Sequence, residues 1–105
     1  MPRKKIPFRT LDTPRGPLRY VLDDTIGVRL FVALDVARAL GYPHIKAATT
    51  TEGWHAYGHS VCLIPGRKKW RMLTDSGIQE VCRHSRKPGA PTLSEWFARQ
   101  ADSAP

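Results

Sequence analysis

Residues 31–42 read FVALDVARALGY, and this stretch decides the fold because a strand-like apolar run passes directly into a short amphipathic helix. Apolar residues recur at helical spacing along one face of that helix, namely Val36, Ala37 and Leu40. Asp35 and Arg38 fall on the other face, which we expect to be polar. Gly41 is the expected left-handed stop at the C-terminal end of the helix.

A second short helix is expected next, because Pro43 suits the first turn of a helix that runs to about Thr50. Two short helices joined by a glycine turn have the layout of a helix-turn-helix, whose second helix lies in the major groove of DNA. On this hypothesis the second helix presents His44, Lys46 and Thr49 to the DNA. The same pattern is common where two helices merely pack together, so it does not assign a function by itself.

An irregular basic arm and a β-hairpin are expected on the N-terminal side of this stretch. Residues 1–17 contain four prolines and a glycine, which disfavour regular structure, and we expect a flexible arm that orders only on contact with a partner. Residues 18–22 and 28–32 read as paired strands joined by a turn at 23–27.

A second hairpin is expected on the C-terminal side, with strands at 59–64 and 68–73 and an exposed basic turn at 65–67. Trp54 and Tyr57 lie in the loop that precedes it. Aromatic side chains in such a loop either pack over a small core or stack on single-stranded bases, and both interpretations stay open here.

Two helices are expected in the remainder of the chain. The candidates for the N-cap of the first helix are Thr74, Asp75 and Ser76. Its apolar stripe consists of Ile78, Val81 and Cys82. Residues 87–91 (KPGAP) break the chain, and Thr92 with Glu95 forms a capping box for the last helix. The core face of that helix holds Leu93, Trp96 and Phe97. Residues 102–105 read as a frayed tail.

The order of these elements predicts a small α+β domain, with antiparallel β-hairpins packed against short helices over residues 18–101. The chain has 105 residues, which fits one domain with a core of its own. No apolar run approaches the ~20 residues of a membrane span. Cys62 and Cys82 lie in apolar patterns and read as buried thiols, so we expect a cytoplasmic protein in a reducing compartment.

The charge of the chain points to a polyanionic partner, because 17 Lys and Arg against 9 Asp and Glu give a formal net charge of +8. The cations concentrate in three runs, at residues 1–19, 67–71 and 83–87. The candidates for phosphate contacts are Arg3, Lys4, Lys5, Arg67, Lys68, Lys69, Arg71, Arg83, Arg86 and Lys87. If they bind DNA, the three runs should lie on one side of the fold.

Catalysis, metal binding and cofactors are not expected. The spacing of His55, His59 and Cys62 fits no common structural zinc pattern, and cysteines within apolar patterns are inert thiols. Ser85, near the end of a helix, either binds a phosphate or donates its hydroxyl to backbone carbonyls of the helix end.

Two blocks of the chain together resemble a Bro-N domain, the N-terminal module of baculovirus Bro proteins and of many phage and prophage antirepressors. The first is residues 31–42, which follow the family form F-x-x-x-D-V-A-x-x-L-G-Y, and the second runs from Leu73-Thr74-Asp75-Ser76-Gly77-Ile78 through His84-Ser85-Arg86-Lys87-Pro88 to Trp96. The resemblance covers about residues 18–100 and implies an α+β fold, DNA binding and a role in phage or prophage gene control. It implies no catalytic residue. Leu93 and Pro91 depart from the family pattern, which suggests a later start for the last helix.

Two classes of function follow. The first is a regulator of transcription that docks on duplex DNA through Lys and Arg contacts to phosphate, and a homodimer on paired half-sites is compatible with it. The second is an antirepressor-type interaction protein that sequesters a repressor or another host protein, with its cations on an acidic protein surface.

Overall fold

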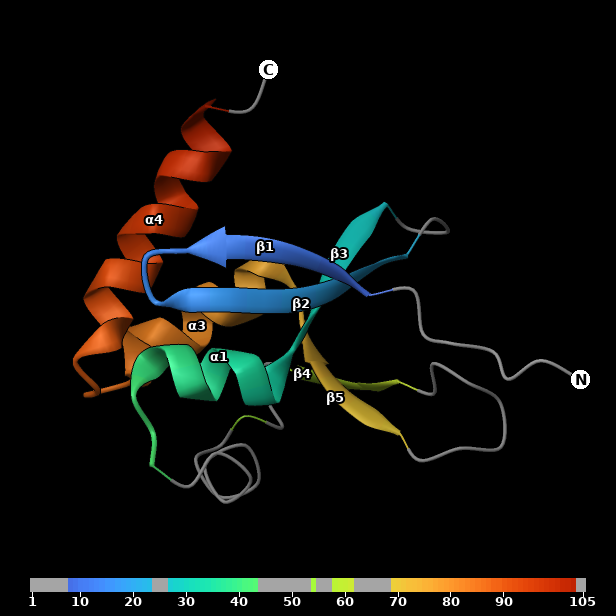
Figure 1. The fold of residues 1–105 in the computed structure, drawn as a ribbon, viewed down its shortest axis with the longest axis horizontal. Helices are drawn as coiled ribbons and strands as arrows, with labels where there is room; N and C mark the ends of the chain where they lie inside the picture. The colour runs from blue at the N-terminus through green and yellow to red at the C-terminus, as the bar shows by residue number, and fades with distance from the viewer. Residues whose placement is uncertain (1–7, 24–26, 44–53, 55–57, 62–68, 104–105) are drawn as a thin grey trace, which may run out of the picture.

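The computed structural model describes residues 8–23, 27–43, 54, 58–61 and 69–103. The elements within these residues are β1 (Arg9–Thr13), β2 (Gly16–Asp23), β3 (Val28–Val32), α1 (Ala33–Leu40), β4 (Gly58–Val61), β5 (Trp70–Leu73), α3 (Asp75–His84) and α4 (Gly89–Ser103). The strands form one antiparallel sheet in the order β1-β2-β3-β5-β4 (Figure 1). This architecture confirms the predicted α+β class. Within the described residues, no helix combines the length and apolar composition needed to cross a membrane.

Both predicted hairpins are present. β2 pairs with β3 in a register that places Tyr20 opposite Phe31, and β4 pairs with β5 with Val61 opposite Trp70. The hairpins are joined by pairing between β3 and β5, which places Phe31 opposite Leu73. The residues of the basic turn at 65–67 lie outside the described part of the chain.

The prediction of an irregular arm at residues 1–17 is wrong for the second half of this segment. Residues 9–13 form β1, which pairs with β2 so that Leu11 lies opposite Leu18. The prolines do not prevent this pairing. Pro14 lies in the turn between the strands, and Pro17 pairs with Asp12 in the part of β2 that has no partner in β3, where its missing N–H breaks no hydrogen bond to that strand. The first half of the arm, with Arg3, Lys4 and Lys5, lies outside the described residues.

Helix α1 and its stop are as predicted. Gly41 has φ 104° and its N–H donates to the carbonyls of Ala37 and Arg38 at 3.2 and 3.1 Å. The conformation is left-handed, which a glycine adopts without strain. The second helix predicted from Pro43 to Thr50 falls largely outside the described residues, and His44, Lys46 and Thr49 fall there with it.

Asp35 lies on the face of α1 that was expected to be polar, but it is buried, with only 3% of its surface exposed. The β2–β3 register begins at Tyr20, so the preceding N–H, that of Arg19, has no partner in β3. The Asp35 carboxylate accepts this N–H at 2.9 Å and also accepts two hydrogen bonds from the Arg19 guanidinium, at 2.9 and 3.0 Å. The carboxylate therefore completes the edge of β2 where the neighbouring strand gives way to the helix.

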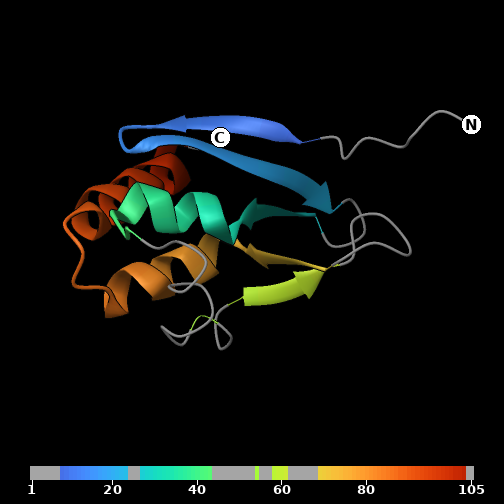
Figure 2. The ribbon, with the colours of Figure 1, turned by 60° about the horizontal axis from the view of Figure 1, so that its bottom comes forward.

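The main core lies between helices α1, α3 and α4 and one face of the sheet (Figure 2). Its largest fully buried side chains include Trp54, Phe31, Leu18, Leu40 and Ile78. Trp54 is 2% exposed and meets Tyr42 edge to face at 6.1 Å between ring centroids. The structure thus confirms the packing interpretation for Trp54, whereas Tyr57 lies outside the described residues.

Helix α3 begins at the predicted cap. The Thr74 hydroxyl accepts the N–H of Gly77 at 3.1 Å. Ser76 is exposed, and its hydroxyl lies 3.1 Å from that of Thr74. Replacing Thr74 with alanine should lower the free energy of unfolding by about 1 kcal/mol, because one helix N–H loses its acceptor. Urea unfolding measures this loss, with Ser76→Ala as the control that should change stability by less than about 0.5 kcal/mol. Equal effects of the two substitutions would contradict the assignment of the cap.

Helix α4 begins earlier than predicted, at Gly89, so the capping box of Thr92 and Glu95 is wrong. Pro91 lies in the first turn, where its missing N–H costs no hydrogen bond. Glu95 instead lies 4.0 Å from Arg99, one turn further along the helix. The helix runs to Ser103, so the predicted frayed tail at 102–105 is also wrong for its first two residues. Of the predicted core residues, Leu93 and Phe97 are buried, and Trp96 is partly buried against them.

Candidate nucleic-acid interface

Four cations from separate segments gather at one end of the molecule. The turn between β1 and β2, the C-terminal ends of α1 and α3, and the connection from α3 to α4 all lie at this end (Figures 1 and 2). We call this surface the basic end, and it comprises Arg15, Arg83, Arg86 and Lys87.

Arg15 is held in place although it is exposed. Its Nε donates to the carbonyl oxygen of Ala39 at 2.8 Å, in the last turn of α1. A cation suits this position because helix C-termini carry partial negative charge. A Cβ on Gly41 would lie 3.7 Å from both the Arg15 guanidinium and the Pro88 ring. The guanidinium is therefore fixed between the end of α1 and the α3–α4 connection.

Lys87 is positioned by a cluster around Ser85. The Ser85 hydroxyl lies 3.2 Å from the Tyr42 hydroxyl and accepts the N–H of Lys87 at 3.2 Å. The Lys87 Nζ lies 5.0 Å from the centroid of the Tyr42 ring, within the range of a cation–π interaction. The local role expected for Ser85 was to donate to backbone carbonyls, but its hydroxyl instead accepts a backbone N–H and lies against the Tyr42 hydroxyl.

Arg83 and Arg86 have different surroundings. Arg83 lies 3.3 Å from Glu80 in a pair whose side chains are 70% and 38% exposed. Such an exposed ion pair is weak, so the guanidinium can exchange the carboxylate for a phosphate at little cost. Arg86 is exposed, and within the described residues no hydrogen bond or ion pair involves it.

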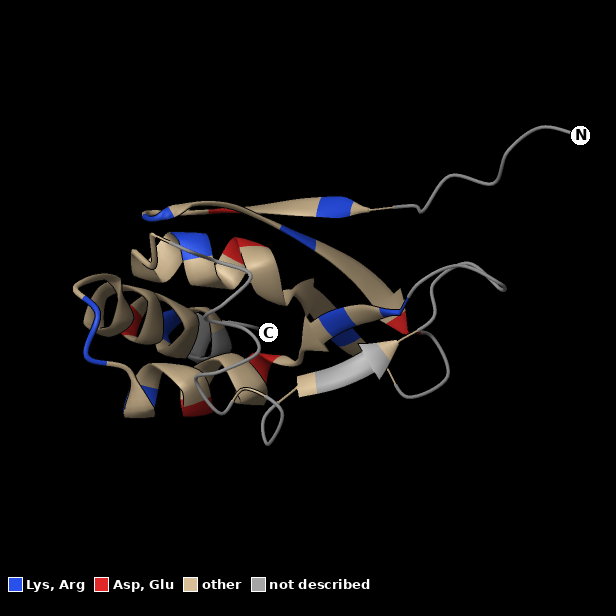
Figure 3. Cartoon of the chain, turned by 90° about the horizontal axis from the view of Figure 1, so that it is seen from below, with Lys and Arg blue, Asp and Glu red and all other residues tan. Residues whose placement is uncertain are grey.

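The expectation that the basic runs lie on one side of the fold is wrong for the described residues. Lys69 and Arg71 lie at the start of β5, toward the end of the molecule opposite the basic end, and Figure 3 shows Lys and Arg at both ends. The physical reason is the path of the chain, which runs from β5 through α3 across the molecule before it reaches residues 83–87. Arg67 and Lys68 lie outside the described residues.

Other arginines are paired within the fold. Arg19 and Arg38 both approach Asp35, Arg29 pairs with Asp75, and Arg99 approaches Glu95. Because these arginines contact carboxylates, the basic end is the larger group of cations, among the described residues, in which few members have a carboxylate partner. Arg15 was not among the site candidates from sequence, since the only local signal was its place in a Pro-Arg-Gly turn.

Two ionisable groups have pKa values displaced by the fold. Burial raises the pKa of the Asp35 carboxyl, but the hydrogen bonds and positive charge of Arg19 outweigh it and hold that pKa below its ordinary value. The hydrogen bond to Asp35 raises the pKa of Arg19 despite partial burial. Burial raises the pKa of Cys82 to about 11, so this thiol is not a nucleophile near neutral pH. Cys62 lies outside the described residues.

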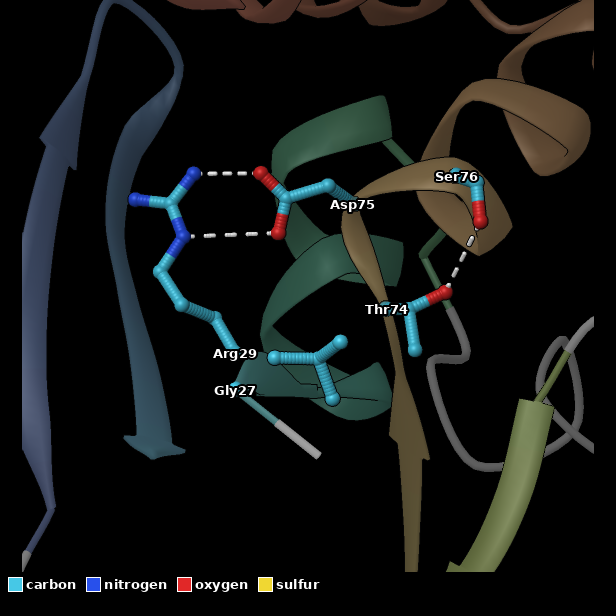
Figure 4. A pocket seen from close by; sticks show the side chains of 6 residues that line it. Gly27, Arg29, Thr74, Asp75 and Ser76 are labelled. Atoms are coloured by element: carbon cyan, nitrogen blue, oxygen red, sulfur yellow. Dashed lines mark hydrogen bonds and ion pairs between the residues drawn. The ribbon is translucent and has the colours of Figure 1, made fainter. Parts of the chain in front are cut away.

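A shallow pocket of about 420 Å³ lies elsewhere, at the start of α3 (Figure 4). It is lined by Gly27, Val28, Arg29, Thr74, Asp75 and Ser76. Arg29 and Asp75 face one another in it, with 3.3 Å between Arg29 Nε and Asp75 Oδ1. The negative charge of the Asp75 carboxylate would repel a bound anion. The same carboxylate already accepts hydrogen bonds from the Arg29 guanidinium. The pocket therefore does not suit a phosphate.

No family model, curated protein or solved structure matches this chain. The resemblance to the Bro-N domain therefore stays a hypothesis carried by the two sequence blocks alone.

Proposed function

We propose that this chain is a DNA-binding protein that docks on duplex phosphates through the basic end alone, without the cations of the 67–71 run, whose described members lie toward the opposite end. The observation that carries the proposal is that Arg15, Arg86 and Lys87 lie at one end of the molecule, where Arg15 and Arg86 are exposed and Lys87 is half-buried. Arg15 is held there by a backbone carbonyl and Lys87 by an aromatic ring, so their charge stays available to a polyanion. Cations fixed before contact lose less conformational freedom when they bind.

Phosphate contacts of this kind set position and orientation but carry no sequence information. Base recognition would fall to the second helix of the predicted helix-turn-helix, with His44, Lys46 and Thr49. Control of phage or prophage genes, in a bacterial cytoplasm and on the nucleoid, is the role that the Bro-N resemblance implies and that we include in the proposal.

Duplex binding and its salt dependence test the proposal. Fluorescence anisotropy with a labelled random duplex should show affinity that falls steeply with salt, because each neutralised phosphate releases counterions. The double variant Arg86→Gln/Lys87→Gln should bind about tenfold or more weakly, with a log–log salt slope that is shallower by about 2. Arg99→Gln is the matched control, since it removes an exposed cation from α4 away from the basic end.

The control should bind within about twofold of the unaltered chain, because its cation is outside the proposed contact. An equal loss of affinity in Arg99→Gln and Arg86→Gln would overturn the assignment of the surface. Absence of duplex binding at low salt would overturn the function itself and favour the antirepressor-type alternative, in which the cations meet an acidic protein surface.

A further inference from the structure

The sheet has a second apolar face, opposite the main core. Neighbouring residues on a strand point to opposite sides, and Val32 and Met72 lie next to Phe31 and Leu73, which belong to the main core. The buried residues of the second face are Val21, Leu30, Val32 and Met72. Among the described residues, α1 is the one helix that contributes to this cluster, through Leu34.

Two partly exposed aromatic rings lie at the margin of this face. Phe8, just before β1, and Trp70, the first residue of β5, meet edge to face with 5.4 Å between ring centroids. The two residues are far apart in the sequence, and each packs against the buried cluster of the second face. The fold therefore brings this ring pair together from two segments that β2 and β3 separate in the order of the sheet.

The guanidinium of Arg19 lies over both rings. Its Cζ is 5.3 Å from the centroid of Phe8 and 5.9 Å from that of Trp70. The two hydrogen bonds to Asp35 fix the plane of this group, yet the Arg19 side chain stays 40% exposed. A guanidinium whose plane is fixed in this way can stack on a further planar group, since the group is planar and weakly hydrated.

We propose that Arg19, Phe8 and Trp70 form a stacking platform for an unpaired base of single-stranded nucleic acid. Bases stack on aromatic rings and on guanidinium planes, and this interaction tolerates any base. Asp35 balances the charge of Arg19, so the platform offers planar surface rather than net charge.

This site is distinct from the basic end. There the described cations have few carboxylate partners, whereas here the guanidinium that lies over the rings is paired with Asp35. A base inside a duplex cannot reach the platform, because both of its faces are stacked. The platform therefore extends the proposed activity to single strands, and its binding should depend less on salt than duplex binding does.

Tryptophan fluorescence with an oligothymidylate of about 12 nucleotides tests the platform, because a stacked base quenches an indole. The chain has three tryptophans. Trp54 is only 2% exposed and is not accessible to a base. We expect the oligonucleotide to quench the unaltered chain and Trp96→Phe, while Trp70→Phe loses the quenching. Phe8→Leu, checked for folding by circular dichroism, should bind the oligonucleotide about fivefold or more weakly.

Quenching that persists in Trp70→Phe, or unchanged oligonucleotide affinity in folded Phe8→Leu, would overturn the platform. The two proposals fail separately. Trp70→Phe should leave duplex affinity unchanged, and Arg86→Gln/Lys87→Gln should keep the quenching of Trp70. A chain that is quenched by the oligonucleotide but does not bind duplex would reject the duplex proposal and support the platform.

Discussion

Replacing Asp35 with alanine is expected to lower the free energy of unfolding by about 3 kcal/mol, because it removes the buried partner of an ion pair. The Asp35 side chain is 2% exposed and accepts three hydrogen bonds from Arg19. Its loss leaves the N–H of β2 without an acceptor inside the protein. The Arg19 guanidinium is 40% exposed and partly regains water, so we expect the lower part of the range for such pairs.

Urea unfolding followed by circular dichroism gives the measurement, and Arg38→Ala gives the control. Arg38 reaches the same carboxylate at 3.7 Å, but its side chain is 62% exposed, so its removal should cost less than about 0.5 kcal/mol. If Asp35→Ala were no more destabilising than Arg38→Ala, the carboxylate would not hold β2 and α1 together.

The same substitution should change the acid limb of the stability profile. The folded state lowers the pKa of Asp35, so its contribution is fully present above the unfolded value of about 3.9 and is lost as pH falls through the folded value. The unaltered chain should therefore lose more stability than Asp35→Ala between neutral pH and the acid range. Parallel profiles for the two proteins would show that another carboxylate governs the acid limb.

Local signals in the sequence were sufficient for the elements that local physics determines. Helix α1 follows from apolar spacing and from the conformational freedom of Gly41, and α3 follows from the Thr74 cap. The strands of both hairpins follow from apolar runs bounded by turn residues. None of these predictions needed knowledge of a distant contact.

The errors arose where a distant contact decides. Helical periodicity placed Asp35 on the polar face of α1. Its carboxylate instead accepts an N–H of β2 that has no partner in β3, and this contact depends on where β3 ends. Proline content assigned residues 9–17 to an arm, but pairing with β2 forms β1 there. The grouping of charge also depends on the path of α3, which separates Lys69 from Lys87 across the molecule. Arg15 becomes a candidate only when the end of α1 is seen beside it.

The start of α4 is the clearest such case, and it gives the second large effect. Replacing a helical glycine with alanine ordinarily stabilises a protein by about 0.5–1 kcal/mol. At Gly89 we expect the opposite sign, because an added Cβ would lie 2.4 Å from the carbonyl oxygen of Ala39 and 2.9 Å from the Cα of Leu40. Both are backbone atoms of α1, so α4 must move away from α1. Overpacking of this kind should cost Gly89→Ala about 3 kcal/mol.

The displacement should also reach the basic end, because the same Cβ would lie 2.8 Å from Arg15 Nε, which donates to that carbonyl of Ala39. Urea unfolding gives the loss of stability, and duplex affinity measured on the folded variant gives the effect on Arg15. Thr92→Ala is the matched control, since Thr92 is exposed in the same part of α4 and should change stability by no more than about 0.5 kcal/mol. A Gly89→Ala variant as stable as the unaltered chain would show that α4 does not begin against α1, and would remove the contact that positions Arg15.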